Sequence, residues 1–429
     1  MRVPVASLFR SLLVFAALTA AAAPARAEPG DEYTISVLTM SPGDPLFFRF
    51  GHNAILVDNA RSRTQAVYNW GTFSFDEPGL VSKFLKARLS YWLSVQRFDG
   101  TLEQYASENR WLQAQELNLT APQKRRLVKM VNDNALPENR FYRYHYYRDN
   151  CSTRVRDVID TATDGSLKAV SGAPSPMTFR GETSRLTADV TWGWFFLNLA
   201  MGDFIDQPIT QWEQMFVPSR VMETLDRAKT LDAQGHEIPL VKSKRMLVTS
   251  DRAPEWTAPP KRGIPMAALG LAFGGLIGWL AQRVLKRPEG SAKTPIGRRL
   301  AFALPVMLLT LMTGFLGSLF LFFWLGTDHE VAWRNENLLQ TSPLSLGMLV
   351  VAGGVLLDRT WARKALPFAA YAIAGMSLLG ALLKVLPWFD QVNGQPILLL
   401  LPIWGGLASG AWLGTRPARV DAGAVKAAN

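Results

Sequence analysis

Residues 147–160 read YRDNCSTRVRDVID and contain the only cysteine among the 429 residues of the chain. Apolar residues follow Cys151 at helical spacing, which predicts a helix that begins at or just after the cysteine. A helix N-terminus presents unpaired N–H groups and a partial positive charge, and both stabilise a thiolate. Asn150 and Ser152 are therefore predicted to form an oxyanion-binding helix start. A small, buried and unreactive thiol is the alternative.

The first residues of the chain predict export. Arg2 and Arg10 precede the apolar stretch LLVFAALTAAAA. The residues ARA before Glu28 fit a signal-peptidase site. Residues 1–27 are therefore predicted to be a cleaved signal peptide, with a retained signal anchor as the alternative. Cysteines of exported proteins usually occur in pairs, and a single cysteine forms no internal disulfide.

Composition divides the mature chain into two parts. Residues 28–250 are long enough to form one globular domain with its own core. A Pro-rich linker, 251–263, leads into a strongly apolar region, 264–415, and a short tail, 416–429, follows. About five membrane spans are predicted, although the third is short against the roughly 20 residues that a span needs. They cover residues 264–281, 300–325, 343–357, 366–383 and 397–413.

Basic residues sort by the side of the membrane. The connections QRVLKRPEGSAKTPIGRR and DRTWARK carry six and three Lys or Arg, whereas GTDHEVAWRNENLLQTS and PWFDQVNGQP carry one between them. This asymmetry predicts a multi-pass membrane protein with the N-terminal domain outside the cytoplasm and the C-terminus in the cytoplasm. The net charge of +11 then reflects topology, and no nucleic-acid partner is expected.

The N-terminal domain is predicted to mix α and β structure. Alternating, β-branched residues predict strands over 32–40, 53–59 and 64–73, the last two joined by a hairpin loop. Apolar residues at helical spacing predict a basic amphipathic helix over 78–96, which either lies on an anionic membrane surface or faces the core.

A thiolate nucleophile needs a base, and the chain has four histidines. His52 is the preferred base because it begins a strand directly after Gly51, while His145 is the nearer one in sequence. Asn69, on the next strand, is predicted to orient the imidazole, with Asp58 as the competing residue. The histidines show no metal-binding spacing, so no metal site is predicted.

The order of these residues, a histidine on one strand, a polar residue on the next and NC at a helix start, resembles the circularly permuted papain-like thiol fold. The lecithin:retinol acyltransferase group is one branch of that fold. The stretches FGHNAILV, VYNWGTFSF, RYHYYRDNCSTRVRD and DQPITQWEQMFVPS more specifically resemble the bacterial Lnb family of lipoprotein N-acyltransferases. That family also carries membrane spans and a loop similar to DHEVAWRNENLLQTSPL.

The resemblance implies an α+β, circularly permuted papain-like periplasmic domain followed by a bundle of transmembrane helices in the bacterial inner membrane. It implies Cys151 as nucleophile, His52 as base and Asn69 as orienting residue. The implied reaction moves an acyl chain from a membrane phospholipid, through a cysteine thioester, to the α-amine of a diacylglyceryl-cysteine lipoprotein. No cofactor is implied.

Other polar residues, near the cysteine or in the loop around His329, are predicted to bind substrate. Alternatively, the loop around His329 braces the catalytic domain, or its polar side chains are only exposed to solvent. Asp203 and Asp206 are expected to shape a docking loop. Two other functions compete, a thiol peptidase or amidase acting on cell-wall peptides and a membrane scaffold or sensor that only binds. The predicted substrate-binding residues are His145, Arg148, Arg154, His329, Asn335 and Asn337.

Overall fold

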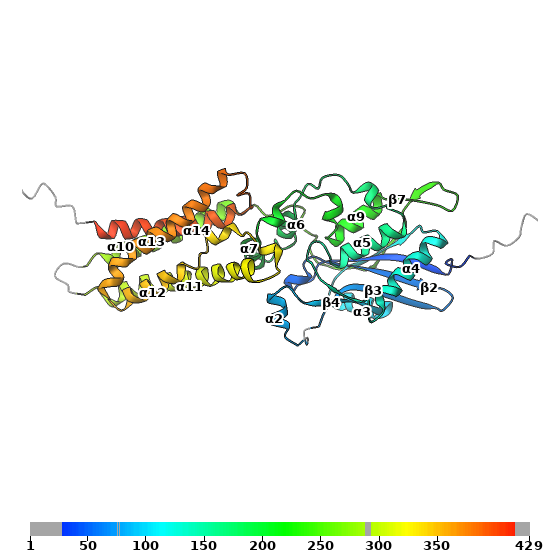
Figure 1. Ribbon diagram of the computed structural model, residues 1–429, viewed down its shortest axis with the longest axis horizontal. Coiled ribbons are helices and arrows are strands. Elements are labelled where there is room, and N and C mark those ends of the chain that lie inside the picture. Colours follow the sequence, from blue (N-terminus) through cyan, green and yellow to red (C-terminus); the bar gives the residue numbers. More distant parts are fainter. Residues whose placement is uncertain (1–27, 75, 77, 288–292, 417–429) are drawn as a thin grey trace, which may run out of the picture.

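The computed structural model describes residues 28–74, 76, 78–287 and 293–416. A mixed α/β domain and a bundle of apolar helices lie end to end along the longest axis of the molecule (Figure 1). The predicted signal peptide and residues 417–429 of the predicted tail lie outside the described residues. A papain-like permutation of the α/β domain stays a prediction.

Within the described residues, the α/β domain contains one seven-stranded antiparallel sheet in the order β6-β4-β3-β2-β1-β5-β9. Its first three strands in sequence lie where alternation predicted strands, and β2 and β3 form the expected hairpin. The strands are β1 (Tyr33–Met40), β2 (His52–Asn59), β3 (Thr64–Thr72), β4 (Ser90–Arg97), β5 (Leu112–Leu117), β6 (Phe141–Arg143) and β9 (Val241–Val248).

Alternate residues of the central strands enter two cores, one on each face of the sheet. Val37 and Ile55 pack in one core with side chains of the helix that carries Cys151, whereas Leu38 and Leu56 pack in the other. This alternation follows from the two-residue period of a strand. Helices α4 (Ala121–Ala135), α5 (Cys151–Ala162) and α9 (Pro218–Arg227) contribute to the first core, and α3 (Phe98–Ser107) covers the second.

The predicted helix over 78–96 is wrong in its second half. Helix α2 (Leu80–Leu85) ends after six residues, and the chain then enters strand β4. β4 lies between β3 and β6, so its backbone groups are paired on both sides, which favours a strand over the helix that the apolar spacing suggested.

Short elements connect these parts. A second, two-stranded sheet joins β7 and β8, and η5 lies in the loop after the second long apolar helix. The connecting elements are η1 (Leu46–Phe48), η2 (Lys168–Val170), α6 (Phe179–Leu186), α7 (Thr191–Ala200), η3 (Asp203–Asp206), α8 (Gln211–Gln214), β7 (Lys229–Leu231), β8 (Glu237–Pro239), η4 (Glu330–Ala332), η5 (Glu336–Leu339) and η6 (Leu383–Val385).

The described part of the C-terminal region contains four helices long and apolar enough to cross a membrane: α10 (Gly263–Leu285), α11 (Ile296–Gly326), α13 (Thr360–Leu382, continued by η6) and α14 (Gly394–Thr415). Helices α10 and α14 pack at glycines. A Cβ placed on Gly274 would lie 2.2 Å from the Pro402 carbonyl oxygen, and one on Gly410 would lie 1.9 Å from the Gly278 oxygen. Such close backbone contact is typical of helices packed in membranes.

The predicted third span differs from the other four. Helix α12 (Ser345–Leu356) has only 12 residues. The segment before it nevertheless lies along α11, because a Cβ on Gly317 would lie 1.8 Å from the Thr341 oxygen. At the other end, Arg299 donates to the Leu356 carbonyl at 2.6 Å. A buried polar segment followed by α12 thus runs antiparallel to α11 from Gly317 back to Arg299.

Candidate active site

Cys151 is the first residue of α5, as the sequence predicted. Asn150 is the N-cap, and its side-chain oxygen accepts from the Ser152 and Thr153 amides at 2.9 and 3.0 Å. The Thr153 hydroxyl accepts in return from the Asn150 amide at 2.8 Å, which completes a capping box. Cys151 is 9% exposed, so the thiol sits at the core surface with a small opening.

His52 and Asn69 come from the two strands of the β2–β3 hairpin. His52 Nε2 lies 3.2 Å from Asn69 Oδ1. The Asn69 amide nitrogen faces the Val67 carbonyl and Gln96 Oε1 at 3.3 and 3.4 Å, which directs its oxygen toward the imidazole. Asp58 instead accepts from a glutamine side chain near the far end of the hairpin. Asn69, rather than Asp58, is therefore placed to orient His52.

The pKa of the Cys151 thiol is lowered overall. Burial by itself raises this pKa, but the charge of His52 and a hydrogen bond from its side chain oppose burial. The Asn53 backbone and the Ser152 hydroxyl lower the pKa further. Since Nε2 of His52 faces Asn69, Nδ1 is the nitrogen left to face the sulfur. This arrangement favours a nucleophilic thiolate.

The helix start offers fewer free amides than the sequence suggested. The Ser152 amide is engaged by the Asn150 side chain, as is the Thr153 amide. The backbone N–H of Cys151 has no acceptor within the described residues. The Cys151 amide is therefore the donor at the helix start that is free to bind an oxyanion formed when the thiolate attacks a carbonyl group. Asn150 holds the helix start in place.

Two tyrosines next to Cys151 were missed by sequence reasoning. Gly71 sits in an irregular part of the β3–β4 pairing with φ +88°. A Cβ placed on it would lie 3.7 Å from Cys151 Cβ, 3.5 Å from Tyr144 Cε2 and 3.9 Å from the Tyr142 hydroxyl. The signal was present in the alternation of FYRYHY, which places Tyr142 and Tyr144 on one side of an extended segment.

The hydroxyl of Tyr142 is buried and has no hydrogen-bond partner among the described residues. Burial raises the pKa of Tyr142, and the nearby Cys151 and Asp149 raise it further, so the hydroxyl stays protonated. The Arg154 guanidinium lies 4.4 Å from the centre of its ring. The Tyr142 hydroxyl is therefore a protonated donor with no acceptor among the described residues, and it lies near Cys151.

His145 is not available as a base. Its Nδ1 accepts from the Tyr147 and Arg148 amides at 3.2 and 3.0 Å, and its Nε2 lies 2.6 Å from Glu330 Oε1. Burial lowers the pKa of His145 while Glu330 opposes that effect. Nδ1 is occupied by two amides and Nε2 faces Glu330, so the geometry favours His52 over His145 as the base.

The loop after α11 braces the α/β domain. His329 Nε2 lies 2.7 Å from the Phe84 carbonyl oxygen, and Arg88 and Arg143 both pair with Asp328 at 3.0 and 3.1 Å. Burial lowers the pKa of His329. These contacts support the bracing alternative for this loop.

Other predicted substrate-binding residues have internal partners as well. Asn335 and Asn337 donate to carbonyls at the end of α7, both reaching Leu199, at 2.8 and 3.0 Å. Arg148 pairs with Glu330 at 3.1 Å, and Arg154 pairs with Asp149. A direct role of these side chains in lipid binding stays a prediction.

Asp203 and Asp206 also have partners. Asp203 pairs with Arg334 at 2.7 Å, and Asp206 forms a buried pair with Arg180 at 2.7 Å. Burial raises the pKa of both carboxyls, and the paired arginines oppose that effect. Asp203 therefore joins the α/β domain to the loop after α11, and Asp206 joins it to the loop before α14, because its Oδ2 accepts from the Val392 amide at 3.1 Å.

The N-terminal part of the chain matches a known protein family. Residues 22–185 match the family described as the Lnb N-terminal periplasmic domain. This part of the chain is an Lnb-type periplasmic domain. No curated protein and no solved structure matches the chain. The Lnb domain includes His52, Asn69 and Cys151, and the membrane-capable helices follow it. The chain is therefore a membrane protein with a periplasmic N-terminal domain, while its cytoplasmic C-terminus stays a prediction.

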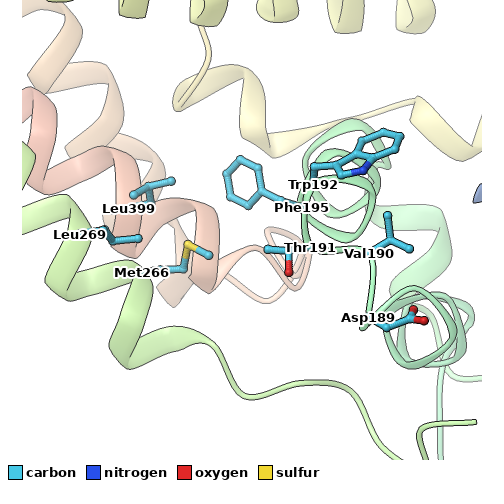
Figure 2. Close-up of a pocket in the computed structure, with 8 residues that line it drawn as sticks. All are labelled: Asp189, Val190, Thr191, Trp192, Phe195, Met266, Leu269 and Leu399. Carbon is cyan, nitrogen blue, oxygen red and sulfur yellow. The ribbon is translucent and has the colours of Figure 1, made fainter. Parts of the chain in front are cut away.

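A cavity of about 630 Å³ lies where the α/β domain meets the bundle, and Cys151 is not among its lining residues. Side chains from α7 face side chains from the periplasmic ends of α10 and α14 across it (Figure 2). Its lining is mostly apolar, with one carboxylate at the edge. The lining residues are Asp189, Val190, Thr191, Trp192, Phe195, Met266, Leu269 and Leu399.

Proposed function

We propose that this protein is a lipoprotein N-acyltransferase. It moves an acyl chain from a membrane phospholipid, through a thioester on Cys151, to the α-amine of a diacylglyceryl-cysteine lipoprotein. One observation carries the proposal: the Cys151 thiol, the His52 imidazole and the Asn69 amide are brought together in an Lnb domain that is joined to membrane helices.

In the first half-reaction, the Cys151 thiolate attacks an ester carbonyl carbon of the phospholipid. The carbonyl oxygen becomes an oxyanion, which the Cys151 amide and the Tyr142 hydroxyl are placed to stabilise. When the tetrahedral intermediate collapses, the carbon–oxygen bond to glycerol breaks. His52 gives its proton to the departing oxygen, which leaves a lysophospholipid and an acyl-thioester.

In the second half-reaction, the lipoprotein amine attacks the thioester carbonyl carbon. His52, now neutral, accepts the proton that the amine loses, and the carbon–sulfur bond breaks. An amide forms on the lipoprotein and Cys151 returns to its starting state. Asn69 keeps the imidazole in one orientation through both steps, because its oxygen accepts from Nε2.

Attachment to the bundle suits substrates that are both anchored in a bilayer. The loop contacts of Asp328, His329 and Glu330 hold the α/β domain against the periplasmic end of the helices. A thiol held at that height meets lipid esters and lipoprotein N-termini by diffusion in two dimensions. A soluble cell-wall peptide gains nothing from this attachment, which favours acyl transfer over the peptidase alternative.

The test uses a bacterial host depleted of its own N-acyltransferase and complemented with the full chain or with Cys151→Ala. Mass spectrometry of lipoprotein N-termini should show N-acylated peptides with the wild-type chain only. Equal acylation by the Cys151→Ala chain would exclude the thioester mechanism. Lack of acylation by both, with the two proteins present at equal levels, would exclude the lipoprotein as acceptor.

A second measurement separates the enzyme from a binding scaffold. The purified chain, mixed with phospholipid vesicles and no acceptor, should gain the mass of one acyl group on Cys151. A thiol that gains no acyl mass and resists mild alkylation at neutral pH would support the scaffold instead.

A further inference from the structure

Four aromatic rings follow one another across the α/β domain toward Cys151. Ring centroids of Phe47 and Phe73 are 6.4 Å apart, those of Phe73 and Tyr91 5.3 Å, and those of Tyr91 and Tyr144 4.3 Å. We call these four residues the aromatic track. Phe47 is 55% exposed, and Phe73, Tyr91 and Tyr144 are half-buried.

The inner end of the track lies at the thiol. Tyr144 and Cys151 approach the same point at Gly71, where an added Cβ would be in ordinary van der Waals contact with both. Gly71 has no side chain, so no side chain at position 71 comes between the ring of Tyr144 and Cys151. An apolar chain lying on the track would therefore end at Cys151.

The outer end of the track lies beside the cavity of Figure 2. Phe47 belongs to η1, and the first residue of η1, Leu46, packs on Gly193 of α7. A Cβ added to Gly193 would lie only 2.7 Å from Leu46 Cδ1. A second contact, the ion pair of Arg49 with Asp189 at 2.5 Å, also holds η1 against the residues that precede α7. Residues at the start of α7 also line the cavity, together with residues of α10 and α14 (Figure 2).

We propose that the aromatic track binds the acyl chain of a glycerolipid and leads it from the cavity at the bundle to Cys151. This inference rests on the proposed function and names the part of the substrate that the track contacts. Three observations select an acyl chain as occupant. The surface is apolar, one end adjoins the outer ends of membrane helices, and the other end is a thiol suited to attack an ester.

The first test measures chain-length selectivity of acyl-enzyme formation. The full-length protein in detergent is mixed with p-nitrophenyl palmitate or p-nitrophenyl butyrate, and acylation of Cys151 is followed by intact mass spectrometry. A carboxylate on the track opposes binding of the long chain, so Phe73→Asp should lower the palmitoyl-to-butyryl rate ratio by at least about tenfold. Phe73→Leu stays apolar and should keep most of the wild-type ratio.

The control places the same charge on an exposed apolar residue elsewhere. Met246 is 51% exposed on β9, at the opposite edge of the sheet, and Met246→Asp should leave the rate ratio unchanged. An unchanged ratio in Phe73→Asp would overturn the track and leave the proposed function standing. Failure of the wild-type chain to accept either ester would overturn both.

The second test needs no substitution. The wild-type chain is placed in vesicles that contain phosphatidylethanolamine with a diazirine midway along one acyl chain, and the cross-linked peptides are mapped after illumination. Label on peptides that contain Phe47 and Phe73, in addition to α7, supports the track. Label confined to the lipid-facing helices α11 and α13 overturns it.

Discussion

His52 Nε2 lies 3.2 Å from Asn69 Oδ1, and the two residues come from adjacent strands of one hairpin. A strand-borne imidazole held by an amide from the neighbouring strand has little freedom to rotate. The pairing also selects the tautomer with hydrogen on Nε2, which leaves Nδ1 as the acceptor that faces Cys151. In the proposed reaction, the hairpin thus determines which nitrogen of His52 takes part in proton transfer.

Asn69→Ala should reduce acyl transfer by about ten- to a hundredfold, because the imidazole loses its orienting partner while the thiol stays in place. Asn69→Asp, which still offers an oxygen acceptor, should restore part of the rate. The pH profile of Cys151 acylation distinguishes positioning from folding, since Asn69→Ala should move the profile. A lower amount of folded protein with an unmoved profile would argue for a structural role.

Alkylation of Cys151 by iodoacetamide should reach half its maximal rate below about pH 8.5, the pKa of an unperturbed thiol. His52 lowers the pKa of Cys151, so His52→Ala should move that midpoint upward, past the ordinary value, because burial then acts with less opposition. The folded-state pKa lies below the unfolded one. The thiolate therefore adds stability that is full above the unfolded pKa and is lost as the pH falls through the folded pKa. A midpoint above that of free cysteine in the wild-type chain contradicts this prediction.

Tyr142→Phe should lower kcat by about 10²- to 10³-fold with little change in KM, because the lost hydroxyl would donate only to the oxyanion. The same change should not lower the free energy of unfolding, since it removes a buried hydroxyl that has no partner among the described residues. Thermal unfolding and acylation kinetics measured on one preparation check both parts. A destabilised variant with unaltered kcat would assign Tyr142 a packing role.

Gly71→Ala should cost about 1–2 kcal/mol of stability, because φ at this residue is +88° and an alanine is strained there. It should also slow acylation, since the added methyl enters the space between Tyr144 and Cys151. Gly100→Ala is the matched control. Nothing lies within 4 Å of a Cβ at Gly100, which is in α3, so that change should be neutral or slightly stabilising.

Local patterns predicted the elements that carry the thiol and the base. Short runs of apolar and β-branched residues predicted the hairpin, because successive residues of β2 and β3 enter the cores on the two opposite faces of the sheet. The start of α5 was readable because apolar residues such as Val155 and Ile159, both buried in the core, follow Cys151 at helical spacing. Both signals come from residues close together in the chain, which is why they could be read without the fold.

Pairing between residues far apart in the sequence could not be predicted from these local patterns. Strand β4 has apolar residues at both helical and strand spacing, and only its neighbours β3 and β6 decide between the two. Tyr142 reaches Cys151 because β6 is the edge strand next to β4, a pairing that no local motif encodes. The partners of His329 and Asn335 lie more than a hundred residues away in sequence, so their bracing contacts could not be separated from ligand binding.

The buried polar segment before α12 has a consequence for biogenesis. Gln340 exchanges hydrogen bonds with Ser377 of α13, and its carbonyl accepts from the Trp404 indole of α14 at 3.2 Å. These partners are translated after the segment itself, and α12 alone, at about 1.5 Å per residue, falls short of the roughly 30 Å hydrocarbon layer. We therefore expect α12 and the polar segment before it to reach their final position only after the last two helices have been synthesised.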